Sequence, residues 1–199
     1  PNLLVAAPSY GPRDLAAMVE DIRTHPGGIS YGSSGVGTMA HLGMELISYM
    51  IGRVPMIHVP YRGSAPMLVD LIAGRVQLSM DNASSSKPRV EAGEYRALGV
   101  SSKTRWFGMP DLPCIGETLA GYEASSWQVV VAPTGTPDAI VAKLNQVLND
   151  ILAEPAIVAR FRELGIDAVG GTPEALDRFI AAETERWRVI IKEAGIQPE

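Results

Sequence analysis

A glycine- and serine-rich segment, Gly-Ser-Ser-Gly-Val-Gly-Thr over residues 32–38, has the residue types of an anion-binding loop. Its glycines let the backbone turn tightly and leave N–H groups uncovered, and its hydroxyls add further donors. A predicted helix follows, whose first N–H groups have no intrahelical partner and attract an anion. The candidate ligand-binding residues here are Ser33, Ser34, Gly35, Gly37 and Thr38. A plain N-cap at Thr38 is the alternative interpretation.

Two nucleotide-binding motifs are excluded for this segment. No Gly-Lys-Ser/Thr sequence follows it, so it is not a Walker motif. Ala40 stands where a dinucleotide fingerprint needs its third glycine, and no ribose-binding acid is evident. The ligand is therefore expected to be a simple anion, either a carboxylate or a phosphate.

Other polar residues follow two predicted strands. Tyr61, Gly63 and Ser64 come after the strand predicted at 56–60, and Asp81 comes after the strand predicted at 76–80. Ligands of open parallel sheets bind at the carboxyl ends of the strands. We therefore expect these residues to meet the 32–38 segment at one edge of the sheet.

The three histidines differ in their surroundings. His41 lies one turn into the helix after the glycine-rich segment, where it could donate to a ligand, sense pH or be a buried structural residue. His58 lies in an apolar strand and is interpreted as structural, while His25 is expected to be solvated at a helix end. No His or Cys pair has metal-ligand spacing, so neither a metal nor a cofactor is predicted.

Covalent catalysis is not predicted. Ser33 or Ser34 with His41 and Asp81 would supply the residue types of a hydrolase triad, but the Gly-x-Ser-x-Gly elbow is absent. Cys114 is the single cysteine, has no evident base nearby, and is interpreted as a small apolar residue. The sequence thus favours a binding protein over an enzyme.

The elements that must position these residues alternate between strand and helix. Such alternation predicts an α/β fold with a mainly parallel sheet. The strands are expected at 3–7, 29–32, 56–60, 76–80, 96–100 and 127–132. Helices are expected to begin at Pro12, Thr38, Ser64 and Ser86, and three amphipathic helices follow residue 132 with Thr136 as the first N-cap. These last helices have only one predicted strand beside them, so they pack on one another or lack their sheet.

Composition narrows the function classes further. The 199 residues are 46% hydrophobic with a net charge of −5, which suits a buried core and argues against a nucleic-acid surface. No stretch of about 18 apolar residues is present, so no membrane span is predicted. The chain begins at Pro1 rather than Met, which we interpret as a processed or truncated form.

The motifs, taken in order, resemble those of the tripartite tricarboxylate transporter receptors, also called Bug proteins. The matching segments span essentially the whole chain and lie at residues 31–41, 58–66, 81–82, 109–113, 121–127, 132–137 and 169–174. The resemblance implies a type II periplasmic-binding fold, in which two α/β lobes close on a ligand. Residues 8–125 would form one nearly complete lobe, and residues 1–7 and 126–199 would be crossing strands and helices of an incomplete second lobe.

The resemblance also implies a function. The protein would be a periplasmic receptor that captures a small carboxylate, such as a dicarboxylate, an amino acid or an aromatic acid. Its partners would be the membrane subunits of a secondary transporter. A ligand-sensing signalling module of the same fold is the alternative. Compared with the family, an N-terminal segment of the first lobe would be missing, and exposed helix faces would then favour a homo-oligomer or a lobe swap.

Overall fold

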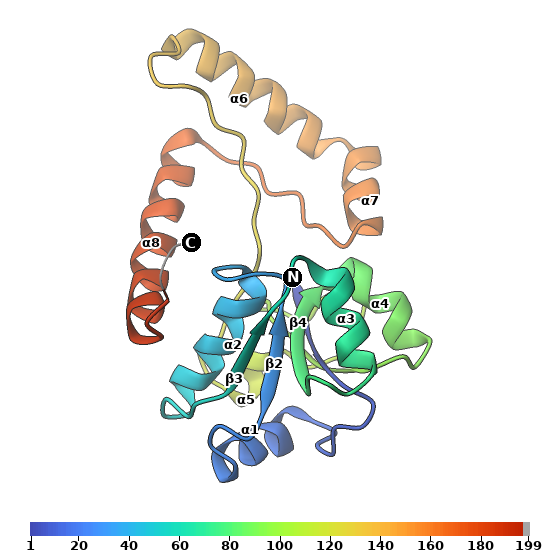
Figure 1. Ribbon diagram of the computed structural model, residues 1–199. Helices are drawn as coiled ribbons and strands as arrows, with labels where there is room; N and C mark the ends of the chain where they lie inside the picture. The colour runs from blue at the N-terminus through green and yellow to red at the C-terminus, as the bar shows by residue number, and fades with distance from the viewer. Residues whose placement is uncertain (197–199) are drawn as a thin grey trace. The chain divides into compact units, whose positions relative to one another are not determined.

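The computed structural model describes residues 1–196 and contains two compact units (Figure 1). Unit 1 comprises residues 1–126 and the C-terminal residues from 190 onward, and unit 2 comprises residues 127–189. We describe each unit by itself. Among residues 1–196, no helix combines the length and the apolar character that crossing a lipid bilayer requires.

Unit 1 is built on one five-stranded sheet with the strand order β3-β2-β4-β1-β5. The strands are β1 (Asn2–Ala6), β2 (Ser30–Ser33), β3 (Ile57–Pro60), β4 (Leu78–Asn82) and β5 (Arg96–Val100). β2 pairs in parallel with β3 and β4, whereas β1 runs antiparallel to β4 and β5. The predicted mainly parallel sheet is therefore found, with β1 as the one strand that points the other way.

β1 lies at the centre of the hydrophobic core. Leu3, Leu4 and Val5 are fully buried, because β1 is flanked by a strand on each side and both faces of the sheet are covered. In the sheet, residues 2–6 are inserted between β4 and β5. Since Asn2 pairs with Asn82, the start of β1 reaches the edge where the parallel strands β2, β3 and β4 end.

In the described part of unit 1, five whole helices and the C-terminal end of a sixth accompany the sheet. The five whole helices are α1 (Leu15–Thr24), α2 (Met39–Met50), α3 (Ser64–Ile72), α4 (Ala83–Glu91) and α5 (Ile115–Thr118). Two predicted starts are wrong. α1 begins three residues after Pro12 because Asp14 caps it, and α4 begins at Ala83 rather than Ser86 because Asn82 accepts a hydrogen bond from the Ser84 N–H.

The cap of α1 allows a simple test of local stability. The Asp14 carboxylate accepts a hydrogen bond from the Ala17 N–H at 2.8 Å. Asp14→Ala is expected to lower the free energy of unfolding by about 1 kcal/mol, because an N–H of the first turn loses its partner. Asp14→Ser, which restores a capping hydroxyl, should recover most of this loss in urea denaturation. Equal losses in both variants would contradict the capping assignment.

Unit 2 consists of helices without a sheet. It contains α6 (Asp138–Ala153), α7 (Pro155–Glu163) and most of α8 (Pro173–Glu193). The loop before α8 is held by Asn149, whose side chain accepts from the Gly171 N–H at 2.7 Å and donates to its carbonyl at 3.0 Å. The predicted cap at Thr136 is wrong, because its hydroxyl donates to the Pro133 carbonyl and α6 begins at Asp138.

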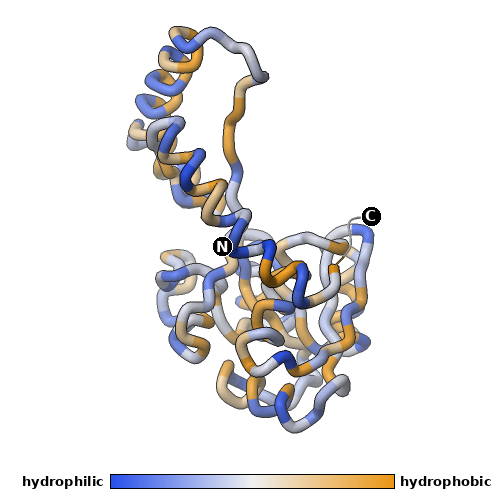
Figure 2. Tube along the Cα trace, turned by 90° about the vertical axis from the view of Figure 1, so that its left-hand side faces the viewer, coloured by the Kyte–Doolittle hydropathy of each residue, from blue (hydrophilic) through white to orange (hydrophobic). Residues whose placement is uncertain are grey.

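The structure contradicts the buried strand predicted over residues 127–132. The segment is extended, yet no described strand pairs with it, so its backbone joins no ladder. Val130 and Val131 are 71% and 73% exposed, and the segment before α6 is coloured hydrophobic over much of its length (Figure 2). α6 likewise exposes large apolar side chains, namely Ile140, Leu144, Val147 and Ile151. Unit 2 therefore carries apolar surface that its own residues do not cover.

Candidate ligand-binding site

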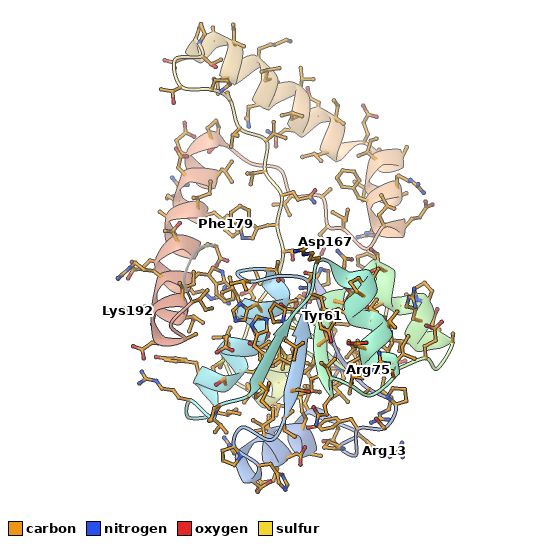
Figure 3. The ribbon with its side chains drawn as sticks, viewed as in Figure 1. Arg13, Tyr61, Arg75, Asp167, Phe179 and Lys192 are labelled. Atoms are coloured by element: carbon orange, nitrogen blue, oxygen red, sulfur yellow. The ribbon has the colours of Figure 1, made fainter. Side chains whose placement is uncertain are left out.

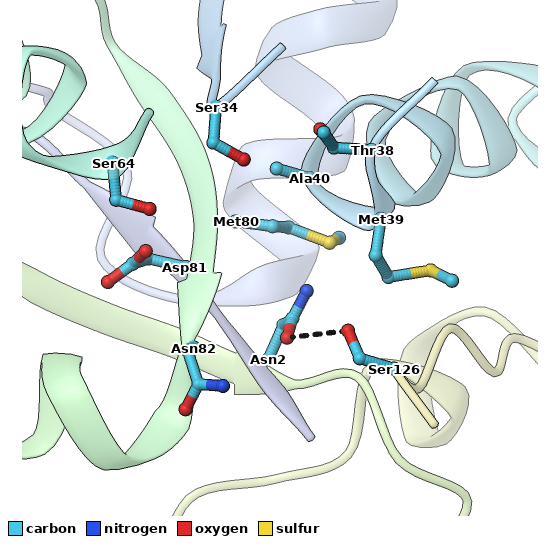
Figure 4. A pocket seen from close by; sticks show the side chains of 10 residues that line it. All are labelled: Asn2, Ser34, Thr38, Met39, Ala40, Ser64, Met80, Asp81, Asn82 and Ser126. Carbon is cyan, nitrogen blue, oxygen red and sulfur yellow. Dashed lines mark hydrogen bonds between the residues drawn. The ribbon is translucent and has the colours of Figure 1, made fainter. Parts of the chain in front are cut away.

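A cavity of about 220 Å³ lies in unit 1 at the edge where β2 and β4 end and β1 begins (Figure 4). Pockets for drug-sized ligands usually span roughly 300–1,000 Å³, so this one suits a smaller molecule. It is lined by Asn2, Ser34, Thr38, Met39, Ala40, Ser64, Met80, Asp81, Asn82 and Ser126.

The cavity brings together part of the predicted site. It is lined by four of the predicted residues, which come from three separate segments of the chain: Ser34, Thr38, Ser64 and Asp81. The other predicted residues, Ser33, Gly35, Gly37, His41, Tyr61 and Gly63, are not among its lining residues. Several of these nevertheless hold the lining residues in place.

Three helices begin at this edge. α2 and α4 start immediately after the cavity residues Thr38 and Asn82, and α3 starts at the cavity residue Ser64 itself. None of the three has an acidic residue in its first turn, and among the described residues no Lys, Arg or His lines the cavity. The positive ends of the helix dipoles, together with the first-turn N–H groups of α2 and α3, which no side chain caps, thus attract an anion without a cationic side chain.

The glycine-rich segment adopts a conformation that its glycines make possible. Gly35 and Gly37 have φ values of +146° and +73°, which side-chain-bearing residues rarely adopt. The Thr38 hydroxyl donates to the Gly35 carbonyl at 2.7 Å, and the Gly63 N–H donates to the Ser34 carbonyl at 3.2 Å. Gly63 therefore contributes to the site by holding the segment rather than by lining the cavity.

A stacked pair of histidines contacts the glycine-rich segment. The rings of His41 and His58 are 3.8 Å apart between centroids and 13° from parallel. The Gly37 N–H donates to His41 Nδ1 at 3.1 Å, so this nitrogen carries no proton. Ser33, which is fully buried, lies 2.7 Å from His58 Nε2 through its hydroxyl oxygen. Through these contacts, His41 and His58 hold the glycine-rich segment in place.

Burial disfavours the protonated form of both histidine rings. It lowers the pKa of His41 to about 4, with a further contribution from His58, and burial also lowers the pKa of His58. Glu45 lies 4.0 Å from His41 Nε2 and accepts a hydrogen bond from Tyr31, whose ring stacks on His58. Burial and the carboxylate of Glu45 raise the pKa of Tyr31.

The Tyr61 side chain contacts α3. Its hydroxyl donates to Asp70 at 2.8 Å, and Asp70 also pairs with Arg75 at the surface. Tyr61 and Arg75 are labelled in Figure 3. Burial and the Asp70 carboxylate raise the pKa of Tyr61 to about 12. In this conformation Tyr61 supports α3 and does not face the cavity.

The geometry of a serine hydrolase is not present. Ser33 contacts His58 rather than His41, its hydroxyl also donates to the Gly35 carbonyl, and it is fully buried. No described carboxylate forms an ion pair with His58. Cys114 is buried, and burial raises the pKa of its thiol. Within residues 1–196, no cluster of His, Cys, Asp and Glu could hold a metal ion.

Sequence reasoning missed Asn2 and Ser126. Asn2 lies at the cavity because β1 is antiparallel to its neighbours, and its side-chain oxygen accepts a hydrogen bond from the Ser126 hydroxyl at 3.4 Å. The polar pair Asp81-Asn82 at a strand end was a usable signal for Asn82. No local signal marked Asn2, because its role depends on strand order.

The fold and the cavity together define unit 1 as an α/β unit with a polar cavity at one edge of its sheet. The family model described as the tripartite tricarboxylate transporter family receptor (TctC) matches residues 1–196. The chain belongs to this family, which confirms the resemblance seen in its motifs.

Three similar proteins illustrate the relationship. The protein encoded in the tcbD-tcbE intergenic region of Pseudomonas sp. strain P51 is 40% identical over 97% of this chain and 58% of its own length. The structure of Rpa4515 from R. palustris with adipate is 42% identical, with a TM-score of 0.86, over 100% of this chain and 67% of that chain. MatC from Rhodopseudomonas palustris with bound malate is 27% identical, with a TM-score of 0.80, over 96% of this chain and 66% of that chain.

These likenesses confirm the predicted fold class, that of the TctC-type periplasmic binding proteins. The chain spans 58% of the length of the Pseudomonas relative and 62% of the length of a curated relative from Bordetella pertussis.

Proposed function

We propose that this protein is a periplasmic solute-binding receptor that captures a small organic acid by a carboxylate group at the unit 1 cavity. The observation that carries the proposal is the meeting of three helix N-termini at a small cavity that no cationic side chain lines. The N–H groups of Ser34 and Val36, which reach no acceptor within residues 1–196, and the Ser34 hydroxyl would hold the carboxylate. Asn2 would supply a further amide donor.

The relatives support the choice of ligand class. A structure similar to this chain holds adipate and another holds malate, both of which are small dicarboxylates. The receptor would deliver its ligand to the membrane subunits of a tripartite transporter, as the family description implies. No covalent step is part of this function.

Calorimetric titration of the 199-residue protein with succinate, malate, aspartate and adipate tests the proposal. We expect saturable binding of at least one acid, and no binding of succinamide, which has the size of succinate but no carboxylate. Ester and amide substrates should show no turnover. Failure of all four acids to bind at millimolar concentration, or hydrolysis of an ester at a rate abolished by Ser33→Ala, would contradict the proposal.

We also propose that the protein self-associates through the apolar surface of unit 2. Unit 2 exposes Val130, Val131 and the large apolar side chains of α6, and exposed apolar surface favours association. Light scattering should give a mass that rises with protein concentration, and Leu144→Lys should reduce this rise. A single monomeric mass at the highest concentrations would contradict the prediction.

A further inference from the structure

Asp81 is a buried carboxylate in a cavity otherwise suited to an anion. The residue is 4% exposed and lines the cavity from the end of β4. A carboxylate so deeply buried requires hydrogen-bond donors or a positive charge as partners. Its partners therefore indicate what the cavity can accept.

The described residues donate hydrogen bonds to only one oxygen of the Asp81 carboxylate. The hydroxyls of Ser85 and Ser86 donate to Oδ2 at 3.0 and 2.9 Å. Among residues 1–196, no hydrogen bond reaches Oδ1 and no ion pair includes Asp81. A carboxylate oxygen can accept two hydrogen bonds, so Oδ1 retains capacity for a donor from the ligand.

The two sides of the cavity differ in chemistry. In Figure 4, the Asp81 carboxylate lies beside Ser64, whereas the Asn2 amide nitrogen points away from Ser126 toward the side of Thr38 and Met39. A ligand carboxylate is attracted to the side with uncovered N–H groups and is repelled by Asp81. The part of the ligand that faces Asp81 must therefore donate a hydrogen bond.

We infer that the preferred ligand carries a hydroxyl or ammonium group close to its carboxylate, and that Asp81 Oδ1 accepts a hydrogen bond from this group. This inference rests on the proposed function and specifies its ligand class, namely small 2-hydroxy or 2-amino acids rather than unsubstituted diacids. Asp81 acts here as a specificity-determining residue.

Succinate, malate and aspartate are matched probes, because they share one carbon skeleton and differ at a single carbon by hydrogen, hydroxyl or ammonium. In calorimetry with the wild-type chain, malate or aspartate is expected to bind at least about tenfold more tightly than succinate, as expected for a hydrogen bond to a charged group. The comparison between malate and aspartate shows which donor is used.

Asp81→Asn keeps the size of the side chain and removes its charge, and it should reduce the preference to less than about threefold. Asp21→Asn is the matched control, because Asp21 also accepts from a hydroxyl, that of Tyr10, but lies outside the cavity.

A purely structural role of Asp81 would change stability without changing the ratio of affinities. Equal affinities in the wild type, or an unchanged ratio in Asp81→Asn, would overturn the inference and leave the proposed function standing. Failure of every acid to bind would overturn both.

Discussion

Lowering the pH from 7 to about 4 is expected to remove about 3 kcal/mol from the free energy of unfolding through His41 alone. The pKa of His41 falls from 6.5 to about 4 in the folded protein. In the unfolded chain the ring binds its proton near pH 6.5, so the unfolded state holds more protons between these values. The free energy of unfolding is therefore highest above pH 6.5, and it decreases as the pH falls toward 4.

The physical cause is the geometry of the histidine pair. Protonation of His41 would place a charge in a buried site, beside the ring of His58, and would remove the acceptor of the Gly37 N–H. Glu45, at 4.0 Å, offsets only part of this cost. Acid should thus loosen the glycine-rich segment before it unfolds the protein.

Urea denaturation at several pH values measures this effect, and the NMR titration of the His41 ring gives the pKa directly. His41→Gln should be less stable than the wild type at pH 7 and should lose less stability on acidification. His25→Gln is the control, because the His25 side chain is 64% exposed and the variant should keep the full pH dependence. A His41 ring that titrates near pH 6.5 would contradict the prediction.

Gly37→Ala is expected to weaken carboxylate binding about five- to thirtyfold. Gly37 has a φ of +73°, and an L-residue in this left-handed conformation costs about 1–2 kcal/mol. The backbone of the glycine-rich segment can avoid this cost only by moving, and the N–H groups then no longer point at the ligand.

Gly27→Ala is a closely matched control. Gly27 has a φ of +71°, and a methyl group added at either glycine meets no atom within 4 Å. Both variants should therefore lose similar stability in thermal denaturation, while only Gly37→Ala should lose affinity in calorimetry. Similar affinity in the two variants would show that the conformation of residue 37 does not matter for binding.

Part of the candidate site could be predicted from the sequence, either from a local pattern or from a position directly after a predicted strand. Ser34 and Thr38 were predicted from a local pattern, and Ser64 and Asp81 from their places after predicted strands. Asn2 could not be predicted in this way, because only the antiparallel insertion of β1 brings it to the same edge. The hydrogen bond from the Tyr61 hydroxyl to Asp70 could not be predicted either, because a side-chain rotamer leaves no trace in the sequence pattern.

The fold shows the same division between local and long-range information. The strand at residues 96–100 was predicted with its observed ends, since an apolar run and its flanking polar residues define it. Residues 127–132 have an equally strong strand pattern, yet a strand also needs a paired neighbour, and none of the described strands provides one. High β-propensity alone therefore did not determine the outcome.

The most direct test of the central claim is an amide chemical-shift map of the ¹⁵N-labelled protein titrated with malate. Binding of a carboxylate at the helix N-termini should produce the largest saturable shifts at the N–H groups of residues 34–38 and at the side-chain amide of Asn2, with succinamide producing none. Shifts confined to other surfaces, or no saturable shift at these amides, would contradict the assignment of this cavity as the carboxylate site.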